Sequence, residues 1–247
     1  MGRFSSAVLT IGLAIMLVPT SANAAEVTAL ISNALASAMD ELTQQFEKAS
    51  GHKLKVTLGP TNPLKGRIEK GEAFDLTVLG SGAIDALVKQ GKLTARADIA
   101  RSQMGVAFRQ GAPKPDVSTT DAFRRMLLNA KSIGFTPDGL SGSHMLAVFA
   151  RLGIADEMKP KARNGRGAEL VSSGEAEIGI TQVSEILGIP RVELAGPLPP
   201  EVQQYTVFPA AISSSAKQPG AASALLKFLA SPEAARVLKA KGLEPAG

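Results

Sequence analysis

Residues 34–81 read ALASAMDELTQQFEKASGHKLKVTLGPTNPLKGRIEKGEAFDLTVLGS, and helical and strand patterns alternate along them. Apolar residues recur at helical spacing through 34–49, whereas 53–58 alternates between polar and apolar side chains as a half-buried strand does. A second helix is expected at 64–70 and an apolar strand at 76–79. Helices that alternate with strands in this way are typical of a parallel sheet with crossover helices.

The same alternation continues on both sides of this stretch. We expect a strand at 27–31 before it and a helix at 84–90 after it. Farther along, the predicted strands are 104–109, 132–135, 178–181 and 205–212, the predicted helices are 119–129, 143–152, 165–173, 221–230 and 232–240, and the proline-rich residues 196–200 are predicted as a loop. Two such α/β units predict two lobes, with a ligand site at the carboxyl ends of the strands, in the cleft between the lobes.

The N-terminus has the three parts of a secretory signal peptide. Arg3 supplies positive charge, 7–18 is an apolar run, and Ala22 and Ala24 are small residues at the positions that a signal peptidase reads. A transmembrane anchor is the alternative, but this run is shorter than the about 20 residues that a bilayer requires. The sequence therefore predicts that residues 1–24 are removed by cleavage after Ala24 and that the mature protein is periplasmic.

Composition excludes several classes of function. The chain has no cysteine and two histidines, so a disulfide, a thiolate metal site and a cysteine nucleophile are excluded, and few metal ligands are left. It has no tryptophan and one tyrosine, too few aromatic rings for stacking on single-stranded nucleic acid. The net charge of +5 is spread along the chain, which favours a small anion over a nucleic acid as partner. We therefore expect no metal and no cofactor.

The order of motifs in residues 34–81 also resembles the N-terminal lobe of molybdate-type periplasmic binding proteins. The likeness continues through SIGFTPDGLSGSHMLAVFARLGI (132–154), GRGAELVSSGEAEIGITQVSEI (165–186), YTVFPAAI (205–212) and ALLKFLASPEAARVLKAKGLEP (224–245). The last segment is similar in many binding proteins, so it indicates the fold and not the ligand. Some proteins similar to this family are periplasmic isomerases of unsaturated tricarboxylates such as aconitate.

The resemblance implies an α/β fold of the two-lobed, type II periplasmic binding class. Lobe one would comprise 25–105 and 207–247, and lobe two 106–206. Two strands would cross between the lobes, near Met104–Arg109 and Thr206–Pro209, and act as a hinge that closes the lobes on a ligand. The resemblance also implies the membrane subunits of an ABC transporter as partners, and we expect the protein to be a monomer.

In that family the oxyanion is held by hydroxyl groups and backbone N–H groups at helix starts, where unpaired donors and a partial positive charge coincide. The matching positions here are Ser32 and Asn33 before the first helix, Thr61 and Asn62 in a proline-flanked turn, Ser141, Gly142 and Ser143 in a glycine–serine loop, and Gln182 and Phe208 near two strand ends. For the residues before the first helix and in the turn, an ordinary capping role is the alternative.

Two donors of the family are missing in this chain. Ala34 stands where the family typically has a serine, and Phe208 where it often has a tyrosine. New polar and basic groups are expected near the cleft instead: Asn62, Lys65, His144, Arg163, Arg166 and Gln182. An arginine fork matches a carboxylate, and Arg166 lies in a glycine-flanked loop before a helix, so we select it as a ligand-binding residue. The expected ligand is therefore an organic anion, with molybdate or tungstate second.

Two classes of function stay open at this point. The favoured one is the substrate-binding protein of an ABC importer, which captures an organic carboxylate or a molybdate-like oxyanion between its lobes. The alternative is a periplasmic isomerase of an unsaturated tricarboxylate, similar to aconitate isomerases, which needs one general base and cations that hold the carboxylates. His144, in the first turn of a helix, is the predicted base in that case. Turnover of the ligand distinguishes the two classes.

Overall fold

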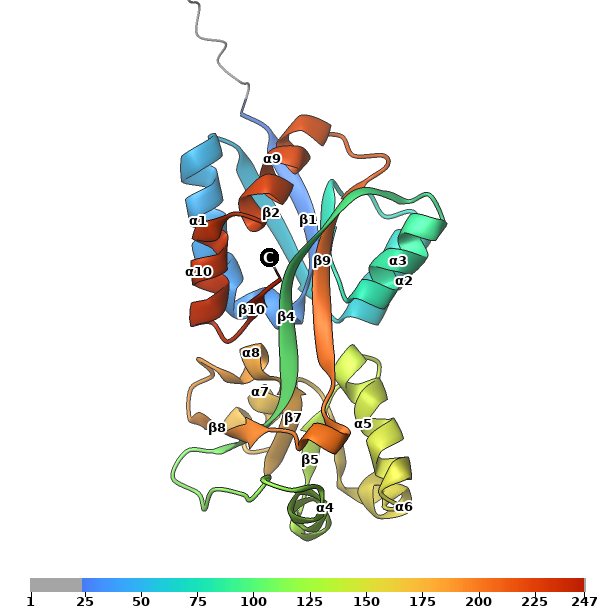
Figure 1. Cartoon of the computed structure of the whole chain (residues 1–247), viewed down its shortest axis with the longest axis vertical. Coiled ribbons are helices and arrows are strands. Elements are labelled where there is room, and N and C mark those ends of the chain that lie inside the picture. Colours follow the sequence, from blue (N-terminus) through green and yellow to red (C-terminus); the bar gives the residue numbers. More distant parts are fainter. Residues whose placement is uncertain (1–23, 247) are drawn as a thin grey trace, which may run out of the picture.

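The computed structural model describes residues 24–246. They form two lobes, stacked along the long axis of the molecule and joined by the long strands β4 and β9 (Figure 1). The predicted signal peptide, except for Ala24, lies outside the described residues. Within residues 24–246, no helix combines the length and the apolar character that crossing a membrane requires.

Strands and helices alternate along most of the chain, as the sequence patterns predict. The strands are β1 Glu26–Ser32, β2 Lys53–Gly59, β3 Leu76–Val78, β4 Leu93–Arg109, β5 Ile133–Phe135, β6 Ala162–Asn164, β7 Ile178–Gln182, β8 Val192–Pro197, β9 Tyr205–Ser213 and β10 Glu244–Pro245. The α-helices are α1 Ala36–Ser50, α2 Thr61–Glu69, α3 Ser81–Lys89, α4 Thr120–Asn129, α5 Leu140–Arg151, α6 Ala155–Met158, α7 Gly167–Ser173, α8 Val183–Ile186, α9 Pro219–Leu229 and α10 Pro232–Ala240. Short 3-10 helices are η1 Asn33–Leu35, η2 Lys159–Lys161 and η3 Pro200–Val202.

The sheet of lobe one has the order β2-β1-β3-β9-β4 and is covered by helices on both faces. Strand β1 explains this arrangement, because Val27, Ala29 and Ile31 are buried on one face and Leu30 on the other. The first face packs against α1, α9 and α10, and the second against α2 and α3 (Figure 1). β1 pairs in parallel with β2 and β3, but β9 runs antiparallel to β3 and β4. The sheet is therefore mixed rather than purely parallel.

Lobe two has its own sheet and its own core. The second part of β4 pairs there with β7 and β8 in antiparallel fashion, and β5 pairs in parallel with β6 and β7. Phe123, Phe135 and Phe149 belong to the core between this sheet and α4, α5 and α6. A smaller cluster joins α7 and α8 to the sheet through Ala168 and Ile186. The two lobes thus bury separate sets of apolar side chains.

Strand β4 is longer than the sequence pattern predicts and belongs to both lobes. Its first part pairs with β9 in lobe one, and its last part, Met104–Arg109, pairs with β7 and β8 in lobe two. The chain therefore crosses from lobe one to lobe two between Gln103 and Met104. It returns to lobe one before Thr206, because Thr206–Pro209 pairs with the lobe-one part of β4. The side chain of Gln203 bonds the backbone N–H and carbonyl of Met104 at 2.9 and 3.0 Å and fixes the two crossings to each other.

Three helices, α2, α3 and α5, start three residues earlier than the periodicity predicts, and α3 begins at Ser81 instead of residue 84. α2 begins at Thr61 instead of residue 64, because Pro63 is tolerated in the first turn of a helix, where its missing N–H has no intrahelical partner to lose. α5 begins at Leu140 instead of residue 143, with Gly139 as its N-cap. The predicted turn and the predicted glycine–serine loop are therefore the first turns of helices.

Several short elements have no counterpart in the sequence prediction: α6, α8, β6, β8 and β10. Four of them contain two to four residues, which is at most about one turn of a helix or too short an alternation to recognise. β8 extends to Pro197, so the predicted loop at 196–200 is partly a strand. Proline is compatible with such a strand end.

Candidate functional site

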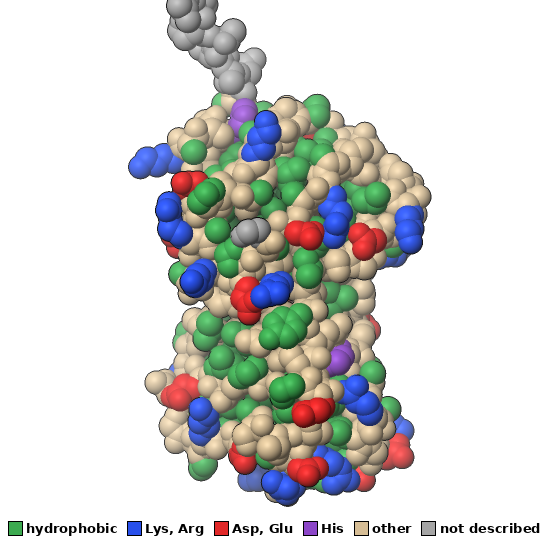
Figure 2. Space-filling view, viewed as in Figure 1, with side chains coloured by type: hydrophobic (Ala, Val, Ile, Leu, Met, Phe, Trp, Pro, Cys, Tyr) green, Lys and Arg blue, Asp and Glu red, His purple; other side chains and the backbone are tan. Residues whose placement is uncertain are grey.

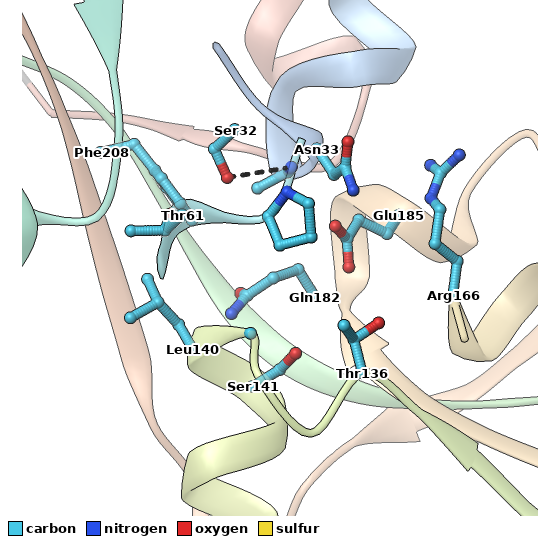
Figure 3. A pocket seen from close by; sticks show the side chains of 13 residues that line it. Ser32, Asn33, Thr61, Thr136, Leu140, Ser141, Arg166, Gln182, Glu185 and Phe208 are labelled. Carbon is cyan, nitrogen blue, oxygen red and sulfur yellow. Dashed lines mark hydrogen bonds between the residues drawn. The ribbon is translucent and has the colours of Figure 1, made fainter. Parts of the chain in front are cut away.

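A small cavity lies between the lobes (Figure 3). Its volume is about 30 Å³, which is room for roughly two water molecules. Strands β1 and β7 end at residues that line it, and the residues that follow β2 and β5 line it too. The cavity thus lies at the carboxyl ends of strands, where ligands of α/β sheets bind. The lining consists of Ser32, Asn33, Ala34, Pro60, Thr61, Thr136, Gly139, Leu140, Ser141, Arg166, Gln182, Glu185 and Phe208.

The starts of five helices surround this cavity. Ser32, Pro60, Gly139, Arg166 and Gln182 are the N-caps of η1, α2, α5, α7 and α8, and each of them lines the cavity. η1 runs directly into α1, so three of these starts belong to helical segments of nine residues or more. Unpaired N–H groups and the positive ends of helix dipoles favour a negative charge at this place.

Three predicted hydroxyl residues belong to these helix starts. Ser32 Oγ accepts a hydrogen bond from the N–H of Ala34 at 3.4 Å, drawn as a dashed line in Figure 3. Thr61 Oγ1 accepts from the N–H of Gly80 at 3.2 Å, and Ser141 lies in the first turn of α5. All three hydroxyl residues are buried. Because Ser32 and Thr61 act as acceptors, each keeps its own O–H to donate to an anion.

The structure brings seven of the predicted ligand-binding residues to the cavity: Ser32, Asn33, Thr61, Ser141, Arg166, Gln182 and Phe208. Three others lie outside its lining. Asn62 is exposed and donates through Nδ2 to the carbonyl of Asp138 at 2.9 Å, which connects lobe one to lobe two. Ser143 is exposed and donates to the carbonyl of Gly139 at 3.0 Å. Gly142 is buried against the backbone of the loop that follows β5.

His144 also lies outside the cavity lining, which corrects the prediction of this residue as a base in the cleft. Its Nε2 is 2.8 Å from the carbonyl oxygen of Val202 in η3, within the same lobe. His144 lies one turn farther into α5 than Ser141, so its ring packs on η3 instead of the helix start. The Gly/Ser context predicts the helix start correctly but not the direction of this side chain.

This position of His144 leads to a prediction. We expect His144→Ala to leave the affinity for an anionic ligand within about twofold of wild type and to lower the free energy of unfolding by about 1 kcal/mol, since one hydrogen bond to a carbonyl is lost. Isothermal titration calorimetry and urea unfolding measure the two quantities. A tenfold loss of affinity with unchanged stability would contradict the placement of His144 outside the ligand site.

The cavity contains a carboxyl group that the sequence analysis missed. Glu185 belongs to α8, which has four residues, and it is one of 22 acidic residues in the chain, so neither periodicity nor composition marks it. One sequence feature could have pointed to Glu185: it follows Thr181 by four residues, and at that spacing the hydroxyl of Thr181 can reach the carboxyl of Glu185. The other lining residues outside the prediction are Ala34, Pro60, Thr136, Gly139 and Leu140.

The carboxyl of Glu185 points toward the cavity, between Asn33 and Gln182 in Figure 3. Its Oε2 accepts a hydrogen bond from the hydroxyl of Thr181. Burial raises the pKa of the Glu185 carboxyl above its ordinary value, and the Thr181 hydrogen bond and the positive charge of Arg166 oppose this rise without cancelling it. Glu185 therefore takes up a proton at a higher pH than an exposed glutamate does.

The raised pKa predicts how the stability of the protein depends on pH. Below the ordinary pKa of a glutamate, the Glu185 carboxyl is neutral in both the folded and the unfolded protein. As the pH rises through the higher pKa of the folded state, the buried carboxyl ionises and the free energy of unfolding falls. We expect Glu185→Gln to melt roughly 2–4 °C above wild type at pH 7, the shift that about 1 kcal/mol gives in a chain of this size. At pH 4 the difference should vanish. Calorimetric melting curves at both pH values check this, and a destabilised variant at pH 7 would contradict it.

Two buried polar atoms at the cavity have no hydrogen-bond partner within residues 24–246. They are Oε1 of Gln182 and Nε of Arg166. Gln182 is 4% exposed, and its Nε2 donates to Thr206 Oγ1 at 3.2 Å. Exchanging the amide oxygen and nitrogen of Gln182 would let it accept from Thr206 and aim an N–H at the cavity. Buried polar groups are rarely left unpaired in proteins, so both atoms are suited to contact a ligand.

The other basic candidates have partners away from the cavity. Lys65 pairs with Glu69 at 2.5 Å along α2, and Arg163 donates to the carbonyls of Pro160 and Ala162. On the face shown in Figure 2, positive and negative side chains are interspersed. Arg166 is therefore the basic side chain that the described residues place in the cavity lining. Within the same residues, no group of three histidine or acidic side chains is arranged to hold a metal ion.

A two-lobed α/β fold, with helix starts gathered around a cavity between the lobes, is the architecture of periplasmic binding proteins, and the comparison with solved structures confirms it. The periplasmic molybdate-binding protein of Azotobacter vinelandii superposes with a TM-score of 0.73 at 19% identity, over 88% of this chain and 98% of that one. The chain belongs to the bacterial extracellular solute-binding proteins, whose family model matches residues 27–244.

Two relatives extend this identification. An aconitate isomerase of a Pseudomonas species is 34% identical, over 88% of this chain and 87% of that protein. The molybdate-binding protein ModA of Azotobacter vinelandii is 26% identical, over 97% of this chain and 98% of that protein. The predicted resemblance to the molybdate-type binding proteins is therefore confirmed.

Proposed function

We propose that this protein captures a small organic anion in the periplasm, in the cavity between its lobes, as the substrate-binding component of an ABC importer. The observation that carries the proposal is the convergence of five helix starts with the guanidinium of Arg166 on one cavity. Such a site offers backbone donors, hydroxyl donors and one full positive charge to an anion.

The lining favours a carboxylate over a tetrahedral metal oxyanion. Ala34 and Phe208 both line the cavity, and neither side chain has the hydroxyl that the molybdate-type family typically supplies there. Arg166 instead offers a planar fork that matches a carboxylate. The isomerase relative acts on a tricarboxylate by its name, and it shares more identity with this chain than the molybdate-binding relative does. Molybdate or tungstate is the second candidate ligand.

Ligand entry requires the lobes to separate. A cavity of about 30 Å³ is far smaller than the 300 Å³ or more that ligand pockets commonly have. Contacts across the cleft hold the lobes together, since Asn62 donates to the carbonyl of Asp138 at 2.9 Å and Ser37 donates to the carbonyl of Ser184 at 3.2 Å. Rotation about the β4 and β9 crossings would break these contacts and open the site. The rotating bodies would be close to the predicted lobes, 25–105 with 207–247 and 106–206, with the crossings at Gln103–Met104 and before Thr206.

A second candidate function is isomerisation of an unsaturated tricarboxylate such as aconitate. It is favoured by the presence of the Glu185 carboxyl in the cavity, since a pure anion receptor gains nothing from a negative group there. The 34% identity to an aconitate isomerase points in the same direction. In this case the site would bind the same class of ligand and also convert it.

The test of the proposal is a ligand panel on the purified mature protein, with cis-aconitate, trans-aconitate, citrate, molybdate, tungstate and sulfate. We expect at least one carboxylate to raise the melting temperature, since a ligand that binds only the folded state stabilises it. Calorimetric titration then gives the dissociation constant. Micromolar binding of molybdate without binding of any carboxylate would overturn the preference for an organic anion.

The location and the partner are tested in cells. We expect the protein in the periplasmic fraction, shortened by the signal peptide, and we expect it to co-purify with ABC transporter membrane subunits after cross-linking in the presence of ligand. Replacement of Ala24 by a bulky residue should leave an uncleaved precursor, because the peptidase reads a small residue at this position. A monomer is expected by sedimentation.

A further inference from the structure

Glu185 stands between two neighbouring cavities of the cleft. The cavity described above and a second one of about 340 Å³ share Asn33, Arg166 and Glu185 in their linings. Lys241, at the end of α10, and Glu169 also line the second cavity, so it contains a second cation and a second carboxyl group. Among the acidic residues that the structure describes, Glu185 is the one that lines both cavities.

We propose that Glu185 is the catalytic acid–base residue of this site and moves a proton between two carbons of an unsaturated di- or tricarboxylate held across the two cavities. This inference rests on the proposed binding of an organic anion and goes beyond it, because it assigns a reaction and a proton carrier to the site. It also replaces His144, whose ring bonds to the carbonyl of Val202 instead.

The surroundings of Glu185 fit a group that gains and loses a proton. Oε2 is held by the hydroxyl of Thr181, which fixes the orientation of the carboxyl. The charges of Arg166 and Glu169 act on it, and these two residues are paired with each other, whereas Lys241 lines the neighbouring cavity. Burial raises the pKa of Glu185, and the Thr181 hydrogen bond and the positive charge of Arg166 act against this rise.

The reaction needs no cofactor, because its atoms and electrons balance within the ligand and Glu185. The ionised carboxylate of Glu185 removes a proton from the CH₂ group beside the double bond, and the C–H electron pair becomes an allylic anion. This anion is delocalised over three carbons and onto the attached carboxylate. The protonated Glu185 then returns the proton to the opposite end of the allyl system, which shifts the double bond and regenerates the base.

Arg166 and the helix starts supply the remaining requirement of the reaction. Negative charge grows on the ligand carboxylates as the allylic anion forms, and a preorganised cation or N–H group stabilises it. Arg166 Nε is buried and has no partner among the described residues, so this N–H is available to the ligand. Lys241 offers a second positive charge to a carboxylate that extends into the neighbouring cavity.

The experiment follows proton transfer and binding separately. The mature protein is incubated with cis-aconitate in D₂O, and proton NMR records both deuterium incorporation at the allylic position and the appearance of trans-aconitate. We expect both with wild type, and a rate at least 100-fold lower with Glu185→Gln. Calorimetry should show that Glu185→Gln binds cis-aconitate as tightly as wild type or more tightly, because the glutamine removes the negative charge and adds an N–H donor.

Glu157→Gln is the matched control, since it removes an exposed carboxylate of the same lobe that lines neither cavity. It should retain the exchange rate within about threefold. The rate of wild type should fall on acidification as Glu185 becomes protonated, and a merely structural role of Glu185 would not produce this profile. Exchange by Glu185→Gln within tenfold of wild type would overturn the proposal.

The two proposals fail in different ways. If wild type binds carboxylates but neither forms trans-aconitate nor incorporates deuterium, Glu185 is not a proton carrier and the proposed capture of an organic anion stands. If wild type binds no carboxylate, the proposed ligand class fails and the catalytic proposal fails with it. Circular dichroism and melting curves of each variant establish that it is folded.

Discussion

Replacement of Gly142 by alanine is expected to lower the free energy of unfolding by about 3 kcal/mol, the upper range for overpacking a buried site, and to abolish ligand binding. A Cβ at this position would lie 1.9 Å from the carbonyl oxygen of Thr136 and 2.7 Å from Cα of Pro137. Both are backbone atoms, so no side-chain rotation can relieve the clash. Urea unfolding measures the stability loss, and calorimetry with a carboxylate measures the binding.

Ligand binding should be lost because the displaced backbone belongs to the site. Thr136 lines the cavity, and its hydroxyl donates to the carbonyl of Gly165 at 3.0 Å. Gly165 immediately precedes Arg166, so a shift of Thr136 moves the loop that positions the guanidinium. Gly142 was selected from the sequence as a ligand contact, and the structure gives it a different task, which is to let α5 start against the loop after β5.

Gly66→Ala provides the matched control. Gly66 also lies within a helix whose start lines the cavity, but a Cβ there would meet no atom within 4 Å. The Gly66→Ala variant should therefore be up to about 1 kcal/mol more stable, because alanine has the higher helix propensity, and its affinity for the carboxylate should not change. A Gly142→Ala protein with wild-type stability and affinity would show that this contact is looser than the structure gives it.

Replacement of Arg166 by alanine is the second change with a large expected effect. We expect the dissociation constant for a carboxylate ligand to rise about 100-fold, which corresponds to about 2.7 kcal/mol and lies within the range of hydrogen bonds to charged groups. Arg166 lines both cavities of the cleft, and one of its nitrogens is buried without a partner. Calorimetric titration of wild type and variant with the same carboxylate checks the ratio.

Arg163→Ala is the control for Arg166. Arg163 is exposed and donates to backbone carbonyls of its own loop, so its removal should change affinity by less than twofold. Arg166→Lys should give an intermediate affinity, because an ammonium keeps the charge but loses the planar fork. If Arg166→Ala binds within threefold of wild type, the charge that holds the ligand comes from elsewhere in the cleft.

Much of the fold follows from local patterns along the chain. The helix at α10 was predicted with the correct bounds, because Pro232 and Gly242 mark its two ends and apolar residues recur between them. β1 and β2 were predicted within one residue at each end, since their residues alternate or are bounded by turns. Periodicity and end signals act within a few residues, so they are readable from one chain. They did not reveal that β4 continues from one lobe into the other, because its pairing partners are distant in sequence.

The site divides in the same way. The sequence alone determined that Ser32, Thr61, Ser141 and Gln182 lie near helix starts and strand ends, because those positions follow from local elements. The tertiary structure decided which side chains meet: Glu185 and Arg166 line one cavity, whereas His144 bonds to Val202 in η3. The direction of a side chain and the loss of water around it depend on the packing of two lobes. For this reason the carboxyl that best fits proton transfer could be recognised only in the folded protein.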